Sequence, residues 1–172
     1  MKIAFTGAQS TGKTTLLKEL KRDNSLALQY DFRDEITRRM QKKGLSINEG
    51  GSDITQLLIM NSHIKNSLID NVIMDRCALD GLVYTDWMYD NKKVSHWVRE
   101  YAENVFNLLI DRYDHIFYCV PDFKYVTDLD RKVKKADNEM IKSLYDNEIR
   151  VLENLLYLHH GKNVVTTLTG SN

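Results

Sequence analysis

The stretch GAQSTGKTT, residues 7–15, decides how this chain folds. It matches the pattern G-x-x-x-x-G-K-[ST], with Gly7, Gly12, Lys13 and Thr14 at the fixed positions. The two glycines let the backbone wrap tightly, so that successive N–H groups point inward at phosphate oxygens. An apolar run, KIAFT, precedes the pattern and a helical pattern follows it, which is the order that a phosphate-binding loop requires. We therefore expect a nucleotide-binding site here.

Each residue of the loop has an expected role. Lys13 would reach the β- and γ-phosphates, and the hydroxyl of Thr14 would ligate Mg²⁺. The helix that begins near Lys13 adds the positive end of its dipole, and Thr15 contacts the α-phosphate or caps that helix. The residues expected to bind the nucleotide are therefore Gly7, Ala8, Gln9, Ser10, Thr11, Gly12, Lys13, Thr14 and Thr15.

Short apolar runs alternate with helical patterns along the whole chain. The runs predict five strands, at residues 2–7, 26–32, 71–75, 115–120 and 163–169. The spacing of apolar residues predicts helices over 14–22, from a cap at Asp53 to about Leu68, after Ser95, and over about 138–160. Because the strands are apolar throughout, both faces of the sheet must be covered. We expect one α/β domain over residues 1–172, a three-layer α/β/α P-loop NTPase fold with a five-stranded parallel sheet.

Composition indicates which partners the protein is expected to bind and in which cellular compartment it is expected to work. Lys plus Arg and Asp plus Glu both number 24, so the formal charge is zero, which argues against broad electrostatic binding of nucleic acid. Cys77 and Cys119 lack metal-type spacing and suit reduced thiols of a cytoplasmic protein. The apolar run at the N-terminus stops at Gly7 and reads as a strand instead of a secretory signal. No run approaches the roughly 20 apolar residues that span a bilayer, so we expect no membrane partner.

The third predicted strand helps to choose among proteins with such a loop. The run VIMD ends on Asp75, which is the expected position of a carboxylate beside Mg²⁺. Arg76 follows, where motor-type ATPases usually place a water-activating glutamate. The fourth strand is followed by VPDF and by no N-K-x-D motif, which disfavours a Ras-like GTPase. A small-molecule kinase that uses ATP fits best.

A charged cluster follows the second predicted strand, in the sequence YDFRDEITRR. It contains Asp31, Arg33, Asp34 and Glu35. Because ligands gather at the carboxyl ends of parallel strands, an acid here could accept the proton of a substrate hydroxyl. We expect Asp34 or Asp31 to be this base, and Arg33 to steady the substrate or the transferred phosphoryl group. The alternative is the solvated start of a helix, where acids are favoured.

Two further segments carry candidate residues. Arg76 is expected, with Lys13, to stabilise charge on the phosphates. Asp80 and Tyr84 lie on the helix leaving that site and either contact substrate or serve as packing and capping residues. The basic stretch DLDRKVKKADN predicts a lid, placed at about 124–138, whose cations close over the phosphates. Its candidates are Arg131, Lys134 and Lys135, and the alternative is a solvated helix face.

These residues resemble a known family. The stretches GAQSTGKTTL, FRDEITRR, TQLLIMNSHI and MDRCALDGLVY look like the ribosylnicotinamide-kinase-like branch of phosphate-loop proteins, the NadR-type AAA domain, up to about Tyr84. The resemblance implies ATP- and Mg²⁺-dependent transfer of phosphate to a hydroxyl of a nucleoside-like compound. It places Lys13 and Thr14 at the nucleotide, Asp75 at the metal, and Arg33 and Asp34 at the acceptor.

The resemblance also bears on Gln56 and on the lid. Gln56 matches a glutamine whose amide could pair with a base edge, although an ordinary helix-surface glutamine is the alternative. The lid lacks the family's D-G-x-R pattern, for which Asp130 and Arg131 are a partial substitute, so that Arg131 is a candidate nucleotide contact.

Three functions therefore compete. The first is a kinase that phosphorylates a hydroxyl of a nucleoside- or nucleotide-type compound. The second is a kinase of hydroxymethylated pyrimidines in DNA, with the lysine pairs at 42–43, 92–93 and 134–135 following the backbone. The third is a non-enzymatic ATP- or GTP-binding switch, in which the nucleotide reshapes the glycine-containing segment 44–52 and the lid.

Overall fold

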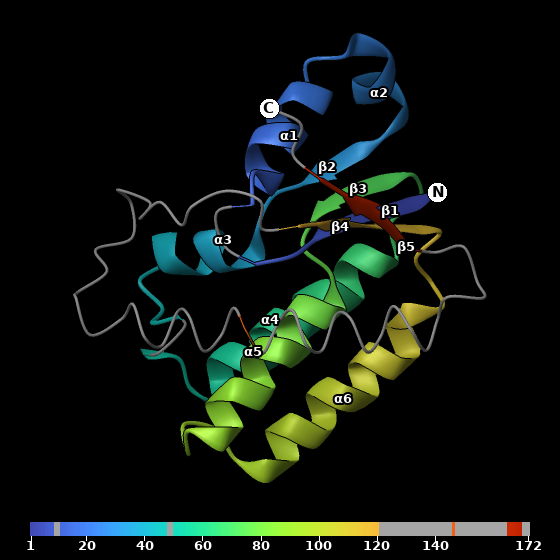
Figure 1. The fold of residues 1–172 in the computed structure, drawn as a ribbon. Helices are drawn as coiled ribbons and strands as arrows, with labels where there is room; N and C mark the ends of the chain where they lie inside the picture. Colours follow the sequence, from blue (N-terminus) through green and yellow to red (C-terminus); the bar gives the residue numbers. More distant parts are fainter. Residues whose placement is uncertain (9–10, 48–49, 121–145, 147–164, 170–172) are drawn as a thin grey trace.

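A five-stranded sheet in which every pairing is parallel forms the centre of the molecule (Figure 1). The computed structural model describes residues 1–8, 11–47, 50–120, 146 and 165–169. The strand order is β2-β3-β1-β4-β5. The strands are β1 (Lys2–Thr6), β2 (Asp31–Arg33), β3 (Val72–Asp75), β4 (His115–Cys119) and β5 (Val165–Leu168). The predicted P-loop NTPase architecture is confirmed.

Helices cover both faces of this sheet. Figure 1 shows α4, α5 and α6 packed together on one side of the sheet and α1 on the other. The helices are α1 (Lys13–Leu20), α2 (Asn24–Gln29), α3 (Ile36–Lys42), α4 (Asp53–Ser67), α5 (Ala78–Asp90) and α6 (His96–Ile110). None of the helices in the described part of the chain has the length and apolar character needed to cross a bilayer.

The apolar strands explain the two layers, because successive side chains point to opposite faces. Ala4, Met74 and Ile116 lie side by side in the ladder and belong to the core under α4, α5 and α6. The next residues along β1 and β4, Phe5 and Phe117, face α1 instead, and their rings stack with centroids 5.1 Å apart. A sheet apolar on both faces therefore needs a helix layer on each.

The predicted strand at 26–32 is wrong over most of its length. Residues Asn24–Gln29 form α2, and β2 is confined to Asp31–Arg33. The Asp23 carboxylate accepts hydrogen bonds from the N–H groups of Ser25 and Leu26, at 2.8 and 3.3 Å, and so caps a helix. None of the residues of α2 is buried. Its leucines produce an apolar run in the sequence that resembles a buried strand, although they lie at the surface.

Helix starts differ from prediction in small but informative ways. Asp53 is the first residue of α4, not its cap, which is Ser52. The Asp53 carboxylate instead accepts hydrogen bonds of 2.8 Å from both the backbone N–H and the hydroxyl of Ser95, the predicted residue at the N-cap of α6. This link fixes the starts of α4 and α6 against one another. The predicted helix at 138–160 and the predicted lid at 124–138 fall outside the described residues.

Gly7 is the point where the phosphate loop meets β4. Its φ is +133°, and a Cβ built there would lie 2.5 Å from the carbonyl oxygen of Cys119. Gly44 also has a positive φ, of +80°, but a Cβ there would have nothing within 4 Å. A substitution at Gly7 would therefore combine backbone strain with a steric overlap, whereas a substitution at Gly44 would cause backbone strain alone.

We predict that Gly7→Ala lowers the free energy of unfolding by about 2–4 kcal/mol, because strain and overlap add. Gly44→Ala should cost only about 1–2 kcal/mol, the cost of a left-handed backbone alone. Urea denaturation of both variants checks this. Equal losses would show that the contact with Cys119 does not constrain the loop.

Candidate functional site

The phosphate loop joins β1 to α1 and curls around the ammonium group of Lys13. This group donates hydrogen bonds to the carbonyl of Gly7 at 2.6 Å, to the hydroxyl of Thr11 at 3.0 Å, and to the carbonyl of Ala8. The lysine is 5% exposed. A cation is thus held at the mouth of a loop whose backbone wraps it, and phosphate oxygens are the natural ligands of such an arrangement.

The remaining loop residues take different places. Gly12, with φ +81°, is the N-cap of α1, so Thr15 does not cap the helix and lies exposed in its first turn. Ala8 and Thr11 are buried in the loop. Gln9 and Ser10 lie outside the described residues, as does Arg131.

Thr14 and Asp75 meet where α1 begins and β3 ends. The Thr14 hydroxyl donates a hydrogen bond of 2.8 Å to Oδ2 of Asp75. Burial raises the pKa of Asp75, while Arg76 and the Thr14 hydrogen bond act in the opposite direction. Among the described residues there is no group of three or more His, Cys, Asp or Glu that could hold a metal. Two adjacent oxygen ligands suit Mg²⁺, which usually takes its other ligands from phosphates and water.

Arg76 is the centre of a buried ionic network. Its Nη1 lies 2.7 Å from Oδ1 of Asp80 and 3.4 Å from the carbonyl oxygen of Gly7, and its Nε lies 3.2 Å from Oε1 of Glu35. The backbone of Arg76 is left-handed, with φ +79°, and its N–H donates to the carbonyl of Phe5. A left-handed non-glycine residue costs about 1–2 kcal/mol, and this geometry directs the guanidinium at the phosphate loop.

Asp80 holds Arg76 in position. Its Oδ2 accepts hydrogen bonds from the Thr6 hydroxyl at 2.8 Å and from the Cys77 N–H at 2.9 Å, while Oδ1 pairs with Arg76. Both carboxylate oxygens are therefore used by the scaffold, and the residue is 2% exposed. Asp80 caps α5 and also lines a cavity described below, so its contact with substrate stays a prediction. The ring of Tyr84 lies 5.7 Å from the Arg76 guanidinium carbon.

The acidic residues around β2 lie at both ends of the strand, with Asp31 at its start and Asp34 and Glu35 after its end. Asp31 begins β2, opposite Val72 at the start of β3, so it lies at the amino end of the sheet and pairs with Arg33. The prediction that Asp31 sits where the strand finishes is wrong, because β2 is only three residues long. Asp34 follows the strand but is exposed.

Glu35 is the acid that enters the interior. It is 5% exposed, and its Oε1 accepts from Arg76 and from the Thr37 hydroxyl, the latter at 2.8 Å. Its Oε2 pairs with Arg38 at 2.8 Å. The sequence placed Glu35 within the cluster but could not single it out. The only hint in the sequence is that Glu35 directly precedes an apolar residue, Ile36, which the structure shows to be buried.

Arg33 lies in a different hollow from Arg76. That hollow is bounded by α3 and α4, and its cations are Arg33, Arg39, Lys43 and Lys65. No carboxylate lines it in the described part of the chain, and the buried Nε of Arg33 has no partner there.

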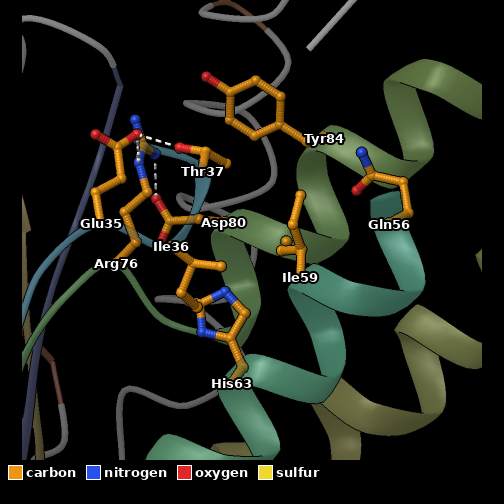
Figure 2. Close-up of a pocket in the computed structure, with 10 residues that line it drawn as sticks. Glu35, Ile36, Thr37, Gln56, Ile59, His63, Arg76, Asp80 and Tyr84 are labelled. Atoms are coloured by element: carbon orange, nitrogen blue, oxygen red, sulfur yellow. Dashed lines mark hydrogen bonds and ion pairs between the residues drawn. The ribbon is translucent and has the colours of Figure 1, made fainter. Parts of the chain in front are cut away.

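A second cavity opens between α3, α4 and α5, next to the Arg76 network (Figure 2). Glu35 and Arg76 line its charged end, and Ile36, Ile59 and Tyr84 supply apolar walls. Its other polar groups come from Thr37, Gln56, His63 and Asp80. The charged groups of the cavity therefore lie next to the phosphate loop, which Arg76 contacts at the Gly7 carbonyl.

Gln56 belongs to this cavity and not to the helix surface. It is 1% exposed, and its Oε1 accepts a hydrogen bond of 3.1 Å from the Thr85 hydroxyl. Its Nε2 lies 2.9 Å from the sulfur of Met88. The helix-surface alternative is wrong, because α5 covers α4 at this position, where Thr85 and Met88 contact Gln56.

His63 was missed by the sequence analysis. It lies on α4 two turns after Gln56 and so on the same side of the helix. It is 3% exposed, and burial lowers its pKa to about 4, with Arg76 and Arg39 acting in the same direction and Asp80 against it. Its Nδ1 has no hydrogen-bond partner among the described residues.

Fold and site together define a P-loop protein of the nucleoside-triphosphate-binding class. The AAA_28 family, described as an AAA domain, matches residues 2–159, and the chain belongs to this family. No curated protein matches the chain.

Solved structures share the fold at low sequence identity. The NadR protein in complex with NR is 20% identical, with a TM-score of 0.62 over 96% of this chain, which spans only 45% of that protein. Deoxyadenosine kinase from M. mycoides with bound dCTP is 14% identical, with a TM-score of 0.63 over 98% of this chain and 90% of that one. Thymidylate kinase from Ehrlichia chaffeensis is 15% identical, with a TM-score of 0.62 over 100% and 89%.

The depressed pKa of His63 predicts a pH dependence of stability. Its ordinary pKa is 6.5 and its folded value is about 4, so between these values the unfolded chain binds the extra proton and stability falls with falling pH. Between pH 7 and pH 5 this residue should remove on the order of 2 kcal/mol from the free energy of unfolding.

His63→Gln is the matched variant, because it keeps a buried polar group that does not titrate. Urea denaturation at pH 7 and pH 5 should show a larger loss in the natural protein than in the variant. Asp75 contributes with the opposite sign, since its pKa is raised, but it is common to both proteins and cancels. Parallel losses would show that His63 is not kept neutral by burial.

Proposed function

We propose that this protein is an ATP-dependent kinase that transfers the γ-phosphate to a hydroxyl of a nucleoside-type compound, with that hydroxyl at the Glu35 and Arg76 end of the cavity between α3, α4 and α5. The observation that carries this proposal is the position of Arg76. Its guanidinium contacts the carbonyl of Gly7 in the phosphate loop on one side and Glu35 in the cavity on the other. A phosphate donor and a hydroxyl acceptor placed at these two sites would meet at one cation.

The donor side uses the loop residues. Lys13 exchanges its carbonyl partners for oxygens of the β- and γ-phosphates, and the loop N–H groups and the start of α1 bind the same anion. Thr14 and Asp75 would hold Mg²⁺, which neutralises charge on the phosphates when it is bound. Arg76 stabilises the charge on the phosphoryl group during transfer.

The acceptor side uses Glu35 as the general base, in place of Asp31 or Asp34. Glu35 is buried beside Arg76, whereas Asp31 lies at the far end of the sheet and Asp34 faces solvent. The acceptor O–H bond breaks, its proton passes to the Glu35 carboxylate, and the oxygen forms a bond to the γ-phosphorus. The bond from that phosphorus to the bridging oxygen breaks, and ADP leaves.

The structural comparisons support the class of reaction. The matched structures include a deoxyadenosine kinase and a thymidylate kinase, in addition to a NadR protein with NR bound. Each of the two kinases is covered along about nine-tenths of its own length. A chain of this size therefore has room for both the donor and the acceptor sites of such an enzyme.

A second candidate is phosphorylation of hydroxymethylated pyrimidines in DNA. The basic hollow formed by Arg33, Arg39, Lys43 and Lys65 favours it, because the described residues place no carboxylate there to oppose a phosphate backbone. Binding to DNA would then weaken steeply with salt. A non-enzymatic nucleotide switch, the third alternative, predicts tight binding of ATP or GTP without transfer to any acceptor.

A screen with γ-labelled ATP tests these alternatives. The acceptors are ribonucleosides, deoxynucleosides, nicotinamide riboside, nucleoside monophosphates and hydroxymethylated DNA. We expect label on a nucleoside. Label on DNA alone would support the second candidate, and nucleotide binding with no labelled acceptor would support the switch.

We predict that Glu35→Gln lowers kcat about 10²–10³-fold, because the amide cannot accept the proton. Asp31→Asn is the control and should retain nearly full kcat, since Asp31 pairs with Arg33 away from the cavity. Steady-state kinetics with the acceptor found in the screen checks both. The base assignment fails if Glu35→Gln retains full activity or if Asp31→Asn loses it.

A further inference from the structure

The basic hollow between α3 and α4 is large enough to hold a small molecule. Its volume is about 340 Å³, within the range of about 300–1,000 Å³ that is usual for such sites. Its apolar lining comes from Ile36, Met40 and Ile69. Its polar lining consists of Arg33, Arg39, Lys43, Ser62, Lys65 and Asn66. None of these described residues belongs to the phosphate loop, so the hollow is a separate place on the molecule.

Three cations of the hollow have no ion-pair partner in the described part of the chain. They are Arg39, Lys43 and Lys65, whereas Arg33 pairs with Asp31. Lys43 is the C-cap of α3 and Lys65 lies in the last turn of α4. The dipole of a helix favours a cation at this end without any ligand. Positive charge alone therefore does not establish a binding site.

Asn66 supplies a second, independent observation. It is only 7% exposed, and its side-chain amide forms no hydrogen bond with the described residues. About nine in ten buried polar groups in proteins are hydrogen-bonded. Neither amide atom is fully enclosed, because the fully enclosed side-chain atoms without a partner in the described ranges belong to Arg33 and His63. The amide is therefore open to the hollow that Asn66 lines, where its two N–H groups can donate to a ligand.

An anion suits this set of groups. Arginine and lysine form strong, charge-assisted hydrogen bonds with phosphate oxygens, and an asparagine amide adds neutral donors. The described residues place no carboxylate in the hollow to repel an anion. A phosphate group carries about 1.5–2 negative charges near pH 7, and a diphosphate carries more, which matches three cations better than a single carboxylate does. The apolar lining leaves room for an organic part beside the anion.

A small anion fits the hollow better than a nucleic acid does. Proteins that bind nucleic acid hold a backbone of many phosphates, each of which needs a cation near it. Here the formal charge of the chain is zero. The amide of Asn66 also lies below the surface, where a single phosphate group reaches it more readily than a polymer backbone.

We propose that the hollow between α3 and α4 is a second anion-binding site, which takes a phosphate or diphosphate group. Arg39 and Lys43 bind this group from α3, and Lys65 and Asn66 bind it from α4. The ligand thereby joins the two helices. Because Glu35 is the N-cap of α3, the ligand also restricts the movement of the acid that pairs with Arg76. The site does not depend on the proposed transfer of phosphate.

A signal from the hollow itself is the first measurement. The side-chain amide of Asn66 gives a pair of ¹⁵N–¹H signals, which are assigned by their loss in Asn66→Ser. We expect these signals to shift and to saturate when inorganic phosphate, pyrophosphate or ribose 5-phosphate is added. Lys13→Ala, titrated in parallel, should give the same Kd, because Lys13 belongs to the phosphate loop. A shift that disappears in Lys13→Ala would report the loop instead and would overturn the proposal.

Lys43→Gln and Lys42→Gln form a matched pair of variants. Both lysines are exposed neighbours at the end of α3, but only Lys43 lines the hollow. Loss of one charged contact should weaken the binding of pyrophosphate about five- to tenfold in Lys43→Gln. Lys42→Gln should change the Kd by less than about twofold, since it removes only a neighbouring charge that salt screens. Equal losses would show a general attraction of anions to a positive surface and would overturn the site.

The probes also distinguish the sources of the anion. Tighter binding of ribose 5-phosphate than of inorganic phosphate would identify an organic phosphate as the ligand, and equal binding would identify free phosphate. Both results support the site. Single-stranded and duplex oligonucleotides are titrated in the same way. The proposal is overturned if an oligonucleotide binds and is weakened by Lys43→Gln while no small anion shifts the Asn66 signals, or if these signals respond to none of the probes.

Discussion

The buried charge of Arg76 is the constraint on which the rest of the site depends. An arginine with 7% of its surface exposed is tolerated only with partners of opposite charge and good geometry, and here these come from Glu35 before α3 and Asp80 on α5. The same cation touches the carbonyl of Gly7. Three stretches that are far apart in the sequence, around Gly7, Glu35 and Arg76–Asp80, must therefore reach their native positions before the charge is satisfied. The network is costly to bury, and its value lies in fixing the cavity against the phosphate loop.

The geometry of the phosphate loop could be predicted from sequence because its determinants are local. A glycine-rich loop needs particular residues at fixed spacing, and a buried strand ending on Asp75 marks the next position along the sheet. Thr14 and Asp75 meet at 2.8 Å because β1, which leads into the loop, and β3, which ends on Asp75, are parallel neighbours in the sheet. Strands apolar throughout likewise predict a sheet covered on both faces.

The cavity between α3, α4 and α5 could not be predicted in the same way, because strand register and helix packing decide which residues line it. Asp31 and Glu35 are both acids in one short run, and only the length of β2 decides which lies at the productive end of the sheet. Gln56 and His63 look like ordinary polar positions of a helix until α5 and α6 cover them. The leucines of α2 cause the opposite error, because they are apolar but lie at the surface, so the sequence wrongly predicts a buried strand there.

The contact between Gly7 and Cys119 fixes how closely the phosphate loop approaches the end of β4. The carbonyl oxygen at the end of β4 stands so close to Gly7 that no Cβ fits between them. Main chain therefore rests directly on main chain, with no side chain in between whose size could vary. Substitutions of side chains on α3, α4 and α5 therefore leave this backbone contact of the loop in place. The position of the phosphate loop against β4 is thus set by a contact between main-chain atoms and does not depend on the size of any side chain.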